Sequence, residues 1–102
     1  MLTSLSMQKE REVSLYLKTV TLRDANDLDA ILDDIRHNNI LIIRVTPLAQ
    51  KSLEDLKMVV EELYKFVRSI HGDIARLGEE RLVITPPGVR IWKNMYESLK
   101  ER

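Results

Sequence analysis

The hydrophobic and polar positions of this chain change period several times, and each period predicts one element of secondary structure. Near the N-terminus, Val13, Leu15 and Leu17 alternate with polar or amphipathic neighbours, as in a strand with one buried face. The phase shifts before Val20, as a bulge, a bend or burial of both faces would produce. We therefore expect a strand over residues 13–22.

Two longer segments repeat their apolar residues at spacings of three and four, which predicts two amphipathic helices. Asp24 or Asn26 can cap the first helix, which ends at Asn38–Asn39. Ser52, with Asp55 three residues later, resembles a capping box that opens a second helix of about 28 Å. The apolar stripes are Ala25, Leu28, Ile31, Leu32 and Ile35 in the first helix, and Leu53, Leu56, Val59, Val60, Leu63, Phe66, Val67 and Ile70 in the second.

Residues 40–45 are almost continuously apolar and rich in β-branched side chains. Such a run is typical of a strand covered on both faces, and Pro47 then ends it. We expect this strand to form the centre of the sheet.

Residues 71–89 form the most informative segment, because they predict a strand, a tight turn and a second strand. Gly72 suits the left-handed conformation that ends helices, and Gly78 can supply a positive φ where the hairpin reverses. Pro86–Pro87 removes two ladder donors and stops the last strand.

A final apolar stripe after the hairpin predicts a short closing helix. The order is then βαβαββ with a C-terminal helix, an α/β fold arranged as a two-layer α/β sandwich. The second face of the sheet must be covered by the closing helix or by another copy of the chain, which favours a dimer. We divide the chain into a lead-in or linker remnant (1–12), a core domain (13–90) and a C-terminal helix (91–102).

Composition narrows the class of protein. The chain has 102 residues, enough for one domain, and its 16 basic residues balance 16 acidic ones. A neutral chain has no global field to attract nucleic acid or anionic lipid. It has no cysteine, no apolar run of the length of a membrane span and no secretory signal, so we expect a cytoplasmic protein.

Residues that could carry catalysis do not form a recognisable set. His37 and His71 lack a second ligand at metal spacing, and a favourable charge near a helix C-terminus explains both. No nucleophile elbow or glycine-rich phosphate loop is present. We therefore expect no enzymatic activity, no cofactor and no metal. Arg76 and Arg81 flank the hairpin turn, either as solvated charges or as the rim of a groove between hairpin and helix that receives an acidic, apolar peptide.

Several motifs resemble those of the SepF family over residues 18–89, and archaeal members are the most similar. The landmarks are Asp24–Leu32, Ile40–Val45, Arg44–Ala49 (RVTPLA), Gly72–Ile74 (GDI) and Thr85–Trp92 (TPPGVRIW). The resemblance implies a non-enzymatic cell-division factor that forms a homodimer or a higher polymer. It also implies binding to the C-terminal tail of FtsZ, and attachment of FtsZ filaments to the inner face of the membrane at the division site.

The resemblance assigns roles to individual positions. In the family, a basic residue before the hairpin turn and a bulky apolar residue on the next strand help to hold the FtsZ tail. The matching positions here are Arg76 and Leu82, and the family more often has Phe at the second position. We expect Arg81, beside them, to contact the tail as well. For the dimer interface we expect Gly72, Ile74, Val83 and Trp92.

Two points stay open at the level of sequence. SepF proteins usually begin with an amphipathic membrane-binding helix and a linker, and residues 1–12 show neither, so we expect membrane contact only through an anchor not evident in this chain. The alternative function is an Alba-like nucleic-acid-binding α/β dimer, which the neutral net charge disfavours.

Overall fold

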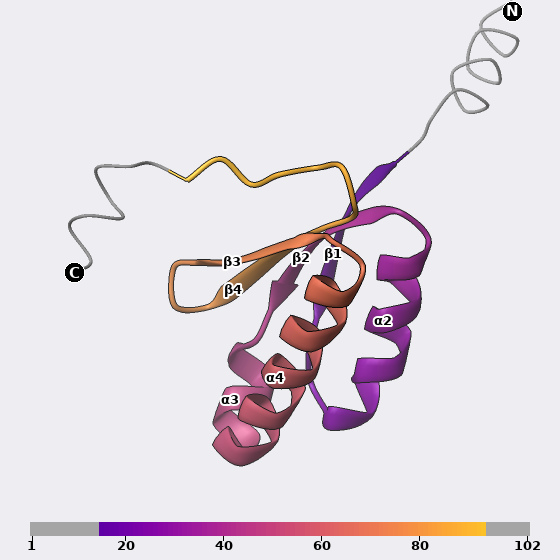
Figure 1. Cartoon of the computed structure of the whole chain (residues 1–102). Coiled ribbons are helices and arrows are strands. Elements are labelled where there is room, and N and C mark those ends of the chain that lie inside the picture. The colour runs from indigo at the N-terminus through magenta and orange to yellow at the C-terminus, as the bar shows by residue number, and fades with distance from the viewer. Residues whose placement is uncertain (1–14, 94–102) are drawn as a thin grey trace, which may run out of the picture.

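The computed structural model describes residues 15–93, which form a four-stranded sheet with helices packed on it (Figure 1). The elements are β1 (Tyr16–Thr21), the 3-10 turn η1 (Ala25–Asp27), α2 (Leu28–Arg36), β2 (Asn39–Arg44), α3 (Thr46–Lys51), α4 (Leu53–Ser69), β3 (Asp73–Leu77) and β4 (Arg81–Thr85). The strand order is β1-β2-β4-β3. β1 runs parallel to β2, and the other neighbouring pairs are antiparallel.

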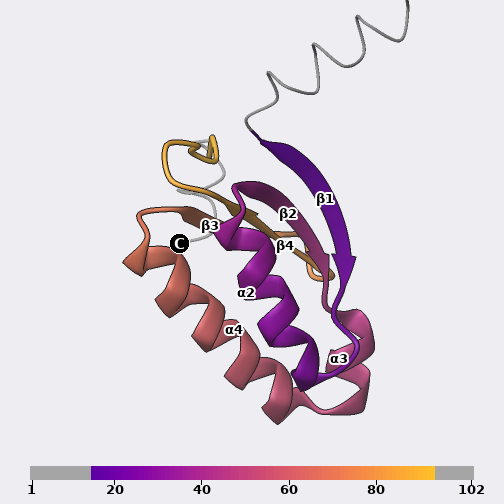
Figure 2. The same cartoon turned by 90° about the vertical axis from the view of Figure 1, so that its right-hand side faces the viewer.

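Helices α2 and α4 cover the same face of the sheet (Figure 2). The predicted two-layer α/β sandwich is therefore confirmed. β2 is a central strand, as expected, and its Leu41 and Ile43 are fully buried beneath the helices. The core between the layers is aliphatic and consists of Leu22, Ile31, Ile35, Leu41, Ile43, Val45, Leu48, Val59, Leu63, Val67, Ile74, Leu82 and Ile84.

The helix starts follow the predicted caps, with one addition. Asp24, not Asn26, is the first cap: its carboxylate accepts from the Asn26 amide at 3.0 Å, in a capping box that opens the 3-10 turn before α2. Ser52 caps α4, because its hydroxyl accepts from the Asp55 amide at 3.1 Å. Pro47 lies in the first turn of α3, a helix that we did not predict; its fixed φ and missing N–H suit a helix start as well as a strand end.

Gly72 has a different role from the predicted one. The left-handed residue after α4 is His71, with a φ of 63°, and Gly72 follows it without a positive φ. Gly72 is required by close packing, since a Cβ there would lie 2.4 Å from the carbonyl oxygen of Thr85. Gly78 does have the predicted positive φ, 71°, in the hairpin turn.

The segment after β4, residues 86–93, is fastened to the start of β3, and we call it the strap. Asp73 accepts from the Ile91 amide at 2.9 Å and from Lys93 Nζ at 3.3 Å, while the Thr85 hydroxyl donates to the Val89 carbonyl at 2.6 Å. Partial burial acts to raise the pKa of Asp73, but these donors outweigh it and hold that pKa below 3.8.

Parts of the predicted boundaries lie outside the described residues. The lead-in, the first two residues of the predicted first strand, and residues 94–102 of the closing helix are among them. Residues 91–93, which the prediction placed in that helix, have no helical conformation and belong to the strap.

Candidate functional site

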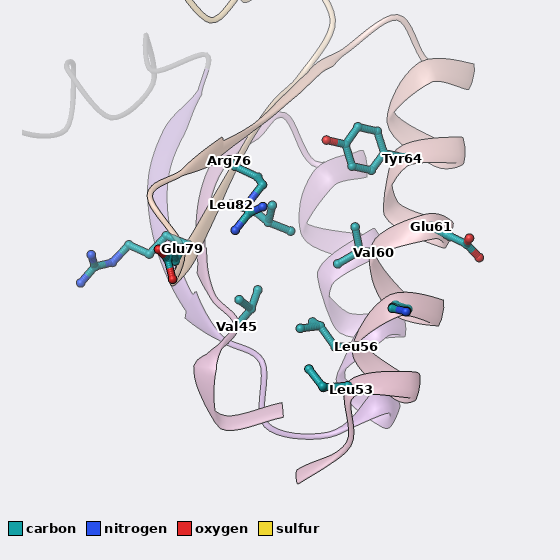
Figure 3. Close-up of a pocket in the computed structure, with 11 residues that line it drawn as sticks. Val45, Leu53, Leu56, Val60, Glu61, Tyr64, Arg76, Glu79 and Leu82 are labelled. Atoms are coloured by element: carbon teal, nitrogen blue, oxygen red, sulfur yellow. The ribbon is translucent and has the colours of Figure 1, made fainter. Parts of the chain in front are cut away.

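A groove of about 410 Å³ lies between α4 and the β3–β4 hairpin (Figure 3). The end of β2 closes it on one side. Its lining consists of Val45, Leu53, Leu56, Lys57, Val60, Glu61, Tyr64, Arg76, Glu79, Arg81 and Leu82. We call this site the groove.

Helix α4 forms one wall because it carries two neighbouring apolar stripes. One stripe, Val59, Leu63 and Val67, is fully buried against the sheet. The second, which also recurs at spacings of three and four, faces the hairpin and stays partly open to solvent; Leu53, at its start, is 65% exposed. The members of the second stripe are Leu53, Leu56, Val60 and Tyr64. The groove is thus the part of an amphipathic helix that the sheet does not cover.

The hairpin forms the opposite wall. Arg76 of β3 and Leu82 of β4 are direct cross-strand partners on the side that faces the helices. Leu82 is only 5% exposed and forms part of the floor, whereas Arg76 is exposed (Figure 3). The structure therefore brings together the two residues that the family resemblance matched to tail binding.

The charged side chains at the groove have no ionic partner within residues 15–93. Lys18, Lys51, Lys65 and Lys93 all form ion pairs elsewhere on the surface. In contrast, Lys57, Arg76, Arg81, Glu61 and Glu79 take part in none of the ion pairs of the described chain. An apolar floor with uncompensated charges at its margin suits a peptide with apolar and charged side chains.

Arg81 has a different position from Arg76. It borders the groove at the hairpin turn, but it alternates with Leu82 and so belongs to the opposite face of the sheet. There it lies directly across from Arg44 of β2. Its predicted role in the groove is therefore limited to the rim.

The opposite face of the sheet is apolar at its centre and carries no helix in the described part of the chain (Figure 2). Leu17 and Leu77 on it are 66% and 50% exposed. By strand register, the remaining apolar side chains of this open face are Ile40, Ile42, Ala75 and Val83. This arrangement agrees with the expectation that the closing helix or a second copy of the chain covers this face.

The four predicted interface residues lie in different environments. Val83 belongs to the open face, and Trp92, in the strap, is 93% exposed. Ile74 faces the helices and is 9% exposed, and Gly72 packs against Thr85. Val83 and Trp92 are therefore the accessible members of a predicted interface.

The described residues hold no cluster of three or more metal-binding side chains. His37 caps the end of α2, where its Nδ1 lies 2.7 Å from the Asp33 carbonyl oxygen. Within residues 15–93, none of the helices has both the length and the apolar character of a transmembrane span.

The sequence predicted a groove between the hairpin and a helix, but it did not identify the residues of the α4 wall, among them Lys57 and Tyr64. The signal was the width of the apolar face of α4, which is broader than one stripe. Leu53, Leu56 and Val60 lie beside the stripe that the sheet buries. A face of this width predicts a second contact, but the sequence does not say with what.

Comparison with known proteins decides the family. Residues 17–91 match the family model described as cell division protein SepF. The chain belongs to the SepF family. Cell division is accordingly the process in which it takes part, and the Alba-like alternative is not supported.

Individual members of the SepF family confirm the resemblance in sequence and fold. Cell division protein SepF of Haloferax volcanii is 29% identical over 80 residues, which cover 78% of this chain and 67% of the relative. A SepF-like protein from Archaeoglobus fulgidus has a TM-score of 0.72 and 25% identity, with coverage of 78% and 94%. One from Pyrococcus furiosus has a TM-score of 0.69 and 32% identity, with coverage of 76% and 94%.

A third solved structure shares the fold alone. It is the cell division protein SepF from Methanobrevibacter smithii in complex with FtsZ-CTD, with a TM-score of 0.69 and 15% identity; the match covers 78% of this chain and 99% of the other.

Proposed function

We propose that this protein is a non-enzymatic cell-division adaptor that binds the C-terminal tail of FtsZ in the groove. The observation that carries the proposal is the pairing of Arg76 with Leu82 on one wall. These are the positions that match the family's tail-binding residues. The SepF protein solved with FtsZ-CTD has the same fold, which supports the same partner for this chain.

Weak binding of one tail by one groove suits this function. A disordered tail loses conformational freedom when it binds, so one groove should have an affinity in roughly the micromolar range. A homodimer formed through the open face presents two grooves, and two tails of one filament then bind with a higher effective concentration. Dimers, and polymers built from them, thereby organise FtsZ filaments.

The cellular role follows from this partner. In our proposal the protein works in the cytoplasm, at the division site, and links FtsZ filaments to the inner face of the membrane. In this proposal, membrane contact is made through an anchor, as the family resemblance implies.

Calorimetric titration with a synthetic FtsZ tail peptide from the same organism tests the proposal. We expect saturable binding at one peptide per chain. Arg76→Glu should weaken it at least tenfold, because a charge-assisted hydrogen bond contributes about 1.5–3 kcal/mol and reversal adds repulsion. Arg90→Glu is the matched control, since Arg90 is exposed on the strap and outside the groove lining. Equal affinity of both variants for the peptide would contradict the proposed site.

A further inference from the structure

The groove has two chemically different ends. Tyr64 and Leu53 are eleven residues apart on α4, so about 16 Å of helix separates them. At the Leu53 end, Leu56 of α4 lies across from Val45, which follows β2, so the side chains there are aliphatic (Figure 3). At the other end, Tyr64 lies across from Arg76 and Leu82. A ligand can therefore distinguish one end of the groove from the other.

The Tyr64 end offers hydrogen-bond donors from both walls. The Tyr64 hydroxyl points away from its own helix, toward the hairpin, while Arg76 extends from β3 on the helix-facing side (Figure 3). Within residues 15–93, neither side chain takes part in a hydrogen bond or an ion pair. The Glu61 carboxylate points away from the hairpin and so does not neutralise Arg76 (Figure 3). The Arg76 guanidinium lies beside Leu82, across the groove from the Tyr64 hydroxyl (Figure 3). Both groups can donate to a carboxylate that is placed between the two walls.

We infer that the groove fixes the direction of the bound tail, with an acidic side chain between Arg76 and Tyr64 and aliphatic side chains at the Leu53 end. This inference rests on the proposed function, because the occupant is the FtsZ tail. Tyr64 becomes a specificity-determining residue that selects a carboxylate at one position. An extended segment that spans the 16 Å contains about five residues, so the acidic and aliphatic side chains should be three to five positions apart.

The test combines one substitution in the protein with one in the peptide. Tyr64→Phe removes only the hydroxyl of a half-buried side chain, so the fold should be retained. A series of tail peptides has each acidic residue replaced in turn by its amide. With the unmodified peptide, Tyr64→Phe should weaken binding about tenfold, as loss of a hydrogen bond to a charged group does. With one peptide of the series, both proteins should bind equally weakly.

Leu56→Ala is the control for packing, since Leu56 lies in the aliphatic part of the groove. It should weaken every peptide by the same factor. If Tyr64→Phe binds the unmodified peptide as tightly as the wild type, or weakens all peptides alike, the inferred direction is wrong while the proposed function stands. If the folded wild-type protein binds no tail peptide, the proposed function and this inference both fail.

Discussion

Gly72 joins α4 to β3 at a point where two backbones touch, and its replacement by alanine measures how much the fold depends on that contact. A Cβ at this position would lie 2.4 Å from the Thr85 carbonyl oxygen and 3.2 Å from Val67 Cγ1. The first distance is far below normal van der Waals contact. The carbonyl is backbone, and Thr85 is 3% exposed, so it cannot move aside without disturbing β4.

The loss of stability on substitution of Gly72 can be estimated from packing alone. Overpacking a rigid site costs about 1–3 kcal/mol, and we expect Gly72→Ala to lie near the upper limit because two strands must separate. Gly78→Ala is the matched control: its Cβ would meet nothing within 4 Å, but its φ is 71°. That substitution should cost only about 1 kcal/mol, from backbone conformation. The total stability of a domain this size is about 5–15 kcal/mol, so both variants are measurable.

Urea denaturation monitored by circular dichroism gives the free energy of unfolding of each variant. All proteins must be compared at one concentration, because dimerisation would add to the apparent stability. Gly72→Ala should have the lower midpoint by a clear margin. If Gly72→Ala does not fold at all while Gly78→Ala does, the conclusion is the same. If the loss for Gly72→Ala is no larger than for Gly78→Ala, the close approach does not constrain the fold.

Two further predictions concern the ends of the same elements. His71 has a φ of 63°, so His71→Gly should raise the free energy of unfolding by up to about 1 kcal/mol, measured in the same urea experiment; a decrease would mean that the His71 side chain stabilises the junction. The pKa of Asp73 is depressed in the folded state, so its stabilisation of the strap is complete above pH 3.8 and is lost as the pH falls through the folded pKa. Hydrogen exchange at the Ile91 amide should therefore stay slow at neutral pH and become fast in Asp73→Asn; equal protection in both proteins would show that Asp73 does not hold the strap.

The elements of the fold were predictable because their signals are local. The caps at Asp24 and Ser52, the apolar run of β2 and the turn at Gly78 each depend on a few neighbouring residues. The role of Gly72 was not predictable, since the constraint comes from Thr85, thirteen positions later in the chain. Nor was α3, because Pro47 is compatible both with the end of a strand and with the start of a helix.

The residues of the candidate site were predictable on one wall only, although the sequence placed the groove between the hairpin and a helix. Arg76 and Leu82 came from the family resemblance and lie together because β3 and β4 pair in the expected register. Tyr64 could not be assigned, since its position depends on which stripe of α4 the sheet buries. That choice is made by tertiary packing between the helix and the strands, which helical periodicity does not encode.

The positions of the two surfaces explain how one small domain could combine dimerisation with tail binding. The groove lies between α4 and the hairpin on the helix side of the sheet, whereas the open face lies on the other side. A dimer that buries the open faces would leave each groove accessible. Dimerisation would then leave the affinity of a single groove unchanged and act on filament binding through effective concentration. In the proposed function, the sheet therefore separates the surface that sets specificity from the surface that sets valency.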